Sequence, residues 1–335
     1  MQFKKIEELR PGMRLARPIY NKNGVMLFDR DAKITAPGIA SIQNFGLIGL
    51  FILEPAEPCP PMSEDDIEFE RFQTVNVFGL MDEIDKIKAQ GKTSKLPILV
   101  SNIVKSYGHL ERKINFNQNL RSEEDAMYKH ALNVAILTAM MSNKLNIKVE
   151  DRLDAVSAAL LRHLVPIETV EKITSSDPNV KRYIFQADKI LEGAEKGEVE
   201  ANVKLMEGGK ILAVADVFDS MTCMSADKTP DSEVATVKYL LSMPGIFEKR
   251  IVMSLVDSIN ILVPGICVEL NTGSKALVIN ENRMDLFKPM VLVFDDNQII
   301  DLSNNAYSDI EIKDVMKTMD NRHVIDTDML KSFGG

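Results

Sequence analysis

The sequence predicts a multidomain, mainly α-helical protein: a central helical bundle between a small N-terminal α+β unit and a small C-terminal antiparallel β-sheet. Three observations lead to this fold class. Long apolar segments with helical spacing dominate residues 121–265. Apolar and polar residues alternate with a period of two near both ends of the chain. Nine residues from Glu54 to Met62 include four prolines, which neither a helix nor a strand accommodates.

Composition limits the functional classes. The 335 residues are enough for two or three compact units, and 45% hydrophobic with 27% charged residues is typical of soluble globular proteins. A net charge of −9 without a basic stripe argues against nucleic-acid and anionic-membrane partners. The three cysteines lie far apart and fit neither a disulfide framework nor a zinc knuckle. We therefore expect a cytoplasmic protein that neither inserts into a membrane nor binds nucleic acid.

Residues 1–55 are expected to form the small α+β domain. The sequence NKNG at 21–24 is a hairpin signal between two short strands. A helix is expected from Thr35 to Phe45, with Thr35 as its cap and Pro37 in its first turn. This domain contains no histidine and no glycine-rich phosphate loop, so the sequence assigns it no chemistry.

Residues 56–62 are the expected proline-rich linker, and residues 63–120 a connector of two helices. Ser63, followed by three acidic residues, begins the first helix, and Gly91 ends it. The second helix is expected from Pro97 to Asn119; its histidine, His109, lies in a polar segment and is expected to be solvated.

The first connector helix also carries a candidate partner face. Its apolar residues are expected either to bind a second copy or another protein, or to pack on the protein's own core. The four residues of this face are Phe72, Val75, Phe78 and Leu80.

The helical core is expected at residues 121–265. His130 lies on one apolar helix and His163 near the end of the next, so both imidazoles are expected in the interior. Asp216 and Asp219 are three residues apart in a later apolar helix and therefore share a face.

The rest of the core is less regular. A charged stretch runs from Ile167 to Gly209. Two more helices are expected, at residues 229–243 and 246–262. The first of these has Thr229 as its cap and Pro230 at its first position.

Residues 266–335 are expected to form three or four antiparallel strands followed by a terminal helix. The sequence NTGS at 271–274 is the first turn between strands. The helix is expected to begin near Asp309, and His323 lies in the polar tail beyond it.

Four segments together resemble an HD-GYP domain, a branch of the HD phosphohydrolase superfamily whose active members hydrolyse cyclic di-GMP. In chain order they are YKHALNVAIL, SAALLRHLVP, KILAVADVFDSMT and VPGICVELNTGSKALVINENRMDLFKPMVLVF. The resemblance covers roughly Glu123 to Asp301. The N-terminal segments LRPGMRLARPIY and GVMLF also resemble the small domain that often precedes such domains.

The resemblance implies a degenerate metal site. His130 matches the first histidine of the family's site, and Asp216 matches its late aspartate. Arg162 and His163 fall where active members have the His-Asp pair, and Pro166 falls on the lysine that follows it. The segment corresponding to the Gly-Tyr-Pro signature, between Ile167 and Gly209, contains no histidine and no such motif.

The chemistry of these substitutions argues against a binuclear site. Two cations need several histidine or carboxylate ligands and a bridging carboxylate, and the chain has only four histidines. His163 cannot bridge two cations, and Arg162 places a permanent positive charge beside it.

The retained residues allow other arrangements. We expect His163, Arg162 and Asp216 to form an ion-pair network in which Arg162 neutralises Asp216. The alternative is a mononuclear metal site of His130, His163 and Asp216. His130 by itself fits a hydrogen-bonded core histidine, and Asp219 fits a carboxylate on the helix surface.

Three functions follow, in order of preference. The first is a catalytically inactive regulatory or scaffolding protein in bacterial cyclic di-GMP signalling, which binds another signalling protein or a second copy of itself. In this function the protein has no catalytic residue and binds neither a metal nor a cofactor. The five residues of its vestigial site are His130, Arg162, His163, Asp216 and Asp219. The second is a metal-dependent phosphohydrolase or cyclic di-GMP phosphodiesterase with a reduced metal site. The third is binding of cyclic di-GMP without cleavage.

Overall fold

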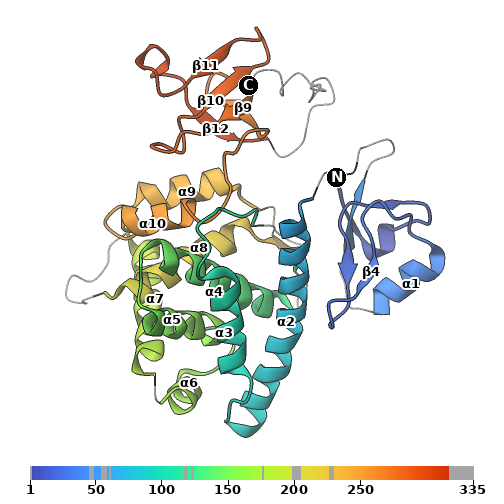
Figure 1. Cartoon of the computed structure of the whole chain (residues 1–335), viewed down its shortest axis with the longest axis vertical. Helices are drawn as coiled ribbons and strands as arrows, with labels where there is room; N and C mark the ends of the chain where they lie inside the picture. The colour runs from blue at the N-terminus through green and yellow to red at the C-terminus, as the bar shows by residue number, and fades with distance from the viewer. Residues whose placement is uncertain are drawn as a thin grey trace. The chain divides into compact units, whose positions relative to one another are not determined.

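A computed structural model describes residues 2–44, 49–53, 59, 62–116, 120–121, 124–175, 177–197, 205–225 and 230–316. The described chain is mainly helical, with small and mostly antiparallel sheets, as the sequence predicted (Figure 1). It divides into two compact units. The first holds residues up to 231 together with 236–259, and the second holds residues 232–235 and the chain from 260 onward. Among the described helices, none combines the length and apolarity needed to cross a membrane.

The N-terminal region is the expected α+β unit. Its elements are β1 (Gln2–Lys5), η1 (Ile6–Glu8), β2 (Arg14–Leu15), β3 (Ile19–Tyr20), β4 (Met26–Phe28), α1 (Ala36–Asn44) and β5 (Gly49–Leu53). Strands β1, β5 and β2 form an antiparallel sheet in that order, and β3 pairs with β4 as the predicted hairpin. Thr35 accepts a hydrogen bond from the Gly38 amide at 3.1 Å, which confirms it as the cap of α1.

The long helix α2 (Glu64–Gln90) begins and ends where the sequence predicted. Ser63 Oγ accepts from the Asp66 amide at 3.2 Å, and Asp66 accepts from the Ser63 amide at 2.9 Å, which is a capping box. Gly91 adopts φ 62°, a left-handed conformation that favours glycine, and its amide donates to Ile87 at 2.7 Å.

The second connector helix is shorter than predicted. Helix α3 (Leu96–Tyr107) ends at Gly108, not near Asn119. After Gly108 the chain extends, and Ile114 forms an isolated parallel β-bridge with Ile259. In this contact the Ile114 amide donates to the Ser258 carbonyl at 3.2 Å, a partner that lies far away in the sequence.

The remaining helices of the described region are α4 (Ala126–Lys144), α5 (Val149–Leu161), α6 (Ile167–Ile173), α7 (Pro178–Lys196), α8 (Glu207–Thr222), α9 (Glu233–Ser242) and α10 (Lys249–Val256). A short parallel pair, β6 (Leu120–Arg121) with β7 (Met224–Ser225), lies in the same unit. Helix α4 is the centre: every residue from His130 to Ser142 is buried, and α4 packs against α2, α3, α5, α8 and α10 (Figure 1).

The charged stretch after Ile167 contains α6 and α7, which the sequence analysis did not resolve. Two end signals of α7 are present in the sequence: Pro178 at its start and Gly197, with φ 81°, at its end. The predicted helix at 229–243 begins later than expected, at Glu233. Ser232 caps it by accepting from the Ala235 amide at 2.9 Å, whereas Thr229 lies outside the described residues.

The second unit is a five-stranded antiparallel sheet of order β11-β10-β9-β8-β12. Its strands are β8 (Cys267–Leu270), β9 (Lys275–Asn280), β10 (Met290–Val293), β11 (Ile299–Asp301) and β12 (Ile312–Val315), with a short 3₁₀ turn η2 (Asn305–Tyr307) before the last strand.

The predicted terminal helix is wrong in its described part. Ile312–Val315 is β12, which pairs with β8. Ile310 and Ile312 alternate with Glu311 and Lys313, and this period-two pattern suits a strand. The free edge of β8 offers it hydrogen-bond partners. His323 lies outside the described residues.

Candidate functional site

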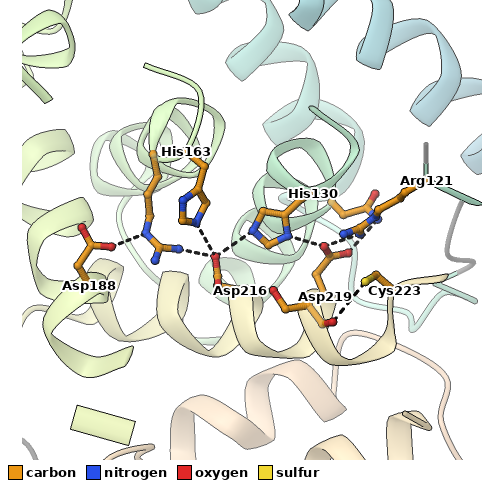
Figure 2. A network of polar contacts seen from close by, with 10 residues as sticks. Arg121, His130, His163, Asp188, Asp216, Asp219 and Cys223 are labelled. Atoms are coloured by element: carbon orange, nitrogen blue, oxygen red, sulfur yellow. Dashed lines mark hydrogen bonds and ion pairs between the residues drawn. The ribbon is translucent and has the colours of Figure 1, made fainter. Parts of the chain in front are cut away.

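The candidate site is built on helix α8, which presents Asp216 and Asp219 toward α4 (Figure 2). Their spacing of three residues places both carboxylates on one side of the helix, as predicted. Both are buried; Asp219 has no exposed surface, so it is not the helix-surface carboxylate considered from sequence. Two carboxylates in the interior require partners, because burying an unpaired charge costs several kcal/mol.

His130 on α4 lies between the two aspartates. Its Nε2 is 3.0 Å from Asp216 Oδ2, and its Nδ1 is 2.7 Å from Asp219 Oδ2. An ionised carboxylate only accepts hydrogen bonds, so both ring nitrogens must carry protons. Burial alone would lower the pKa of His130, but the hydrogen bonds and negative charges of the two aspartates outweigh burial and raise this pKa to about 9. At neutral pH His130 is therefore an imidazolium.

Asp219 is held by two further side chains, Arg121 and Asn133. Its Oδ2 accepts from Arg121 Nη2 at 2.5 Å, and its Oδ1 accepts from Asn133 Nδ2 at 2.9 Å. Asn133 in turn accepts from Gln73 Nε2 on α2 at 2.9 Å. Burial would raise the pKa of Asp219, but the charge of Arg121 and the contacts with His130 outweigh burial and lower it. Asp219 is therefore an anion with fixed partners.

Asp216 has two cationic neighbours and a second histidine. Its Oδ2 accepts from Arg162 Nη1, and His163 Nε2 lies 3.3 Å from the same oxygen. Arg162 Nε donates to Asp188 Oδ1 at 2.8 Å, so the guanidinium joins α7 to α8 (Figure 2). Burial would raise the pKa of Asp216, but hydrogen bonds from both histidines and the charges of Arg162 and His130 hold it well below its usual range.

The charges of the site balance within the protein. Asp216, Asp219 and Asp188 are matched by Arg121, Arg162 and the imidazolium of His130. The ion pair expected between Arg162 and Asp216 is present. The side chain of Arg162 is only 7% exposed. Its positive charge therefore lies beside Asp216, the carboxylate that a metal ion would bind.

One group of potential metal ligands occurs in the described part of the chain. The group consists of His130, His163 and Asp216. Each offers one ligand atom, and these three atoms lie within 4.8 Å of one another. The residues do not fit the pair of metals that the HD-GYP resemblance implies. In that resemblance His163 falls on the bridging carboxylate, and an imidazole cannot bridge two cations. In the structure, Arg162 contacts Asp216 Oδ2 directly. The donor set fits one cation at most, and only if Arg162 and the Nε2 proton of His130 are displaced.

Four members of this network are not among the residues predicted from the sequence: Arg121, Asn133, Gln73 and Asp188. Asn133 follows His130 by three residues and so shares its helix face, which is a usable signal. Gln73 is a lone amide in the buried stripe of α2, and the rule that buried polar groups need partners marks it. Neither Arg121 nor Asp188 carries a comparable local signal.

The candidate partner face on α2 does not form one surface. Leu80 is completely buried, whereas Phe78 is 39% exposed; at about 100° per residue they lie about 200° apart around the helix. Phe72 is half-buried against Tyr107, with ring centroids 4.9 Å apart. Leu80 therefore belongs to the core, with Val75 half-buried and Phe78 the exposed member of the four.

Comparisons of this chain with protein-family models, with curated proteins and with solved structures found no match.

Proposed function

We propose that this chain is a non-catalytic HD-GYP-like protein that acts as a regulatory or scaffolding module in bacterial cyclic di-GMP signalling. In this proposal it works in the cytoplasm by binding another signalling protein, or a second copy of itself, and not by turnover. The family assignment depends on the four sequence segments described above. The assignment of a non-catalytic role depends on the site.

One observation carries the non-catalytic role: Asp216 is already neutralised inside the protein. Arg162 and the imidazolium of His130 both contact its Oδ2. Metal-assisted hydrolysis of a phosphodiester needs cations that generate hydroxide and bind the phosphoryl oxygens. Arg162 supplies positive charge, but a guanidinium cannot activate a bound water in this way.

The same network argues for a protein partner over cyclic di-GMP. Arg162 is the cation that a phosphate would use, yet it is shared between Asp188 and Asp216. Arg121 is likewise paired with Asp219. An entering phosphate would have to compete with carboxylates that hold both guanidinium groups, and this repulsion weakens nucleotide binding.

A hydrolysis assay tests the proposal. Protein purified without chelator is incubated with cyclic di-GMP, and separately with bis(4-nitrophenyl) phosphate, over a range of manganese concentrations. We expect no turnover above that of an Asp216→Asn variant prepared in the same way. A rate that rises with manganese in the wild-type protein and disappears in Asp216→Asn would overturn the non-catalytic role.

The second candidate is a metal-dependent phosphohydrolase with a reduced site. The proximity of His130, His163 and Asp216 favours it, because two imidazoles and a carboxylate are an acceptable ligand set. When bound, a metal would supply an activated water for attack on phosphorus. Elemental analysis distinguishes the candidates: this enzyme would carry one metal per chain that a His163→Ala variant lacks, whereas the non-catalytic protein would carry none.

A further inference from the structure

We propose that Arg162 is a built-in substitute for a divalent cation, and that the neighbouring side chains form a latent metal site which becomes available when the guanidinium is removed. The proposal rests on the proposed function in one respect: the wild-type protein must lack a metal at this place. It goes further by naming the residue that keeps the metal out and the ligands that would receive it.

The ligand atoms already lie near the spacing that a zinc ion requires. A tetrahedral zinc ion with bonds of roughly 2.0–2.1 Å has ligand atoms about 3.3 Å apart. Around Asp216 Oδ2, the His130 Nε2 lies at 3.0 Å and the His163 Nε2 at 3.3 Å. All three atoms lie within 4.8 Å of one another. With the guanidinium removed, small rotations of the side chains and loss of the Nε2 proton of His130 would give one cation three protein ligands and leave a fourth position for water.

The ligands are also held in place by neighbouring side chains. His130 also contacts Asp219 through Nδ1 at 2.7 Å, which fixes the orientation of its ring. A carboxylate on the second nitrogen is the partner that metal-bound histidines usually have. Asp219 is itself fixed by Arg121 and Asn133. The latent site thus already has a supporting layer, and this layer does not include Arg162.

Arg162 is the side chain that excludes a metal ion from these ligands. Arg162 Nη1 contacts Asp216 Oδ2, the oxygen that both His130 and His163 also contact. A divalent ion would have to remove that contact and then sit beside a buried guanidinium. Repulsion between the two cations in a partly desolvated site opposes this arrangement strongly. Arg162 is also anchored from behind by Asp188 at 2.8 Å, which holds the guanidinium in place.

The structure also identifies the open side of the site. The side chain of His163 is 33% exposed, whereas that of His130 is 9% exposed. The two rings are neighbours, with centroids 5.4 Å apart. A cation can therefore approach from the His163 side without unfolding the helices around α4.

The experiment compares zinc binding by four full-length proteins: wild type, Arg162→Ala, Arg162→Gln and Arg162→Lys. Binding is measured by isothermal titration calorimetry, and by the shift of the thermal unfolding midpoint on adding zinc. Arg162→Gln keeps most of the side-chain volume and a hydrogen-bond donor, so it tests the idea even where Arg162→Ala folds poorly. Arg162→Lys keeps the positive charge and is the matched control.

We expect the Ala and Gln variants to gain one bound zinc ion per chain and a raised unfolding midpoint, and wild type and Arg162→Lys to show neither. Adding Asp216→Asn to the Arg162→Gln variant should abolish the gain, which separates this site from zinc bound by surface cysteines or histidines. The inference is overturned if folded Arg162→Gln takes up no zinc, or if its zinc survives Asp216→Asn; the proposed function would stand. Zinc in the wild-type protein that depends on Asp216 would overturn both.

Discussion

Two completely buried carboxylates, Glu83 on α2 and Asp219 on α8, are satisfied in opposite ways. Glu83 accepts from neutral donors: the amides of Ser94, Lys95 and Leu96, at 2.6 to 3.1 Å, and the hydroxyls of Thr93 and Ser94. Asp219 is matched by the cations Arg121 and His130. Glu83 caps the first turn of α3, where unpaired amides and the helix dipole favour an anion.

The difference shows what is special about the helical core. Neutral donors are enough to bury a carboxylate in this protein, so a structural role alone does not require the charges around Asp216 and Asp219. Cations gathered at two buried carboxylates are the arrangement that the proposed replacement of a metal ion by Arg162 would leave. The comparison therefore predicts that removing a cation from the core has a larger effect than weakening the neutral cap at Glu83.

The largest expected effect is that of Arg162→Ala. The substitution leaves Asp216 buried with one cation fewer and should lower the free energy of unfolding by about 4 kcal/mol. Arg112 is the matched control, because it also pairs with a carboxylate, Asp65, but its side chain is 56% exposed. Arg112→Ala should cost under about 1 kcal/mol. Urea melts of the two variants measure the difference, and equal costs would contradict the ion-paired description of the core.

The next effect is a pH dependence of stability that comes from His130. Its pKa is raised to about 9 in the folded protein, against an unfolded value near 6.5. A group whose pKa is raised on folding stabilises the protein fully at pH values below its unfolded pKa. This stabilisation is lost as the pH rises through the folded pKa. Stability should therefore fall by about 3 kcal/mol between roughly pH 6.5 and pH 9.

Urea melts across that range test the prediction. A His130→Gln variant should be less stable at neutral pH and lack this pH dependence, whereas His109→Gln, at an exposed position, should behave like wild type. A flat wild-type profile between pH 6.5 and 9 would mean that His130 is not a stabilising imidazolium.

Glu83→Gln should have a smaller effect than Arg162→Ala, about 2 to 3 kcal/mol, because the amide oxygen can replace Oε1 as an acceptor, but the charge is lost and the NH2 group cannot accept from Ser94 Oγ as Oε2 does. Burial would raise the pKa of Glu83, but the hydrogen bonds from Ser94, Thr93 and Lys95 lower it to about 2. A group whose pKa is lowered on folding stabilises the protein at pH values above its unfolded pKa, which is about 4.3 for a glutamate. This stabilisation is lost as the pH falls toward 2. The stability difference between wild type and Glu83→Gln should therefore shrink as pH falls through this window; a constant difference would contradict it.

The sequence predicted those parts of the fold that local signals determine. Ser63 and Gly91 carry cap signals within a few residues of the helix ends, and His130 lies in an apolar helix whose burial follows from composition. Asp216 and Asp219 share a face because of their spacing alone. Each of these predictions needs only neighbouring residues.

The rest depends on contacts between distant segments. Arg121 reaches Asp219 across 98 residues, and Gln73 reaches Asn133 across 60. Neither pairing leaves a local trace in the sequence. The same reason explains the wrong terminal helix: β8 decides that Ile312–Val315 is a strand, and β8 lies more than forty residues earlier. The four residues of the candidate partner face are divided for a local reason: Leu80 and Phe78 lie on nearly opposite sides of α2, so only one of these two is buried.

The smallest expected effect on stability is at Phe78. Phe78→Ser should change the free energy of unfolding by under about 1 kcal/mol, because the side chain is 39% exposed. Leu80, two residues further along α2, is the matched control: it has no exposed surface, so Leu80→Ser should cost about 3 kcal/mol or more.

Sedimentation of wild type and Phe78→Ser then tests whether this side of α2 joins two copies. If wild type is a dimer and Phe78→Ser a folded monomer, the partner is a second copy of this chain. If both sediment as monomers, self-association is excluded and the proposed partner must be a different protein. A Phe78→Ser variant that unfolds as readily as Leu80→Ser would instead make Phe78 part of the core and remove it from any binding face.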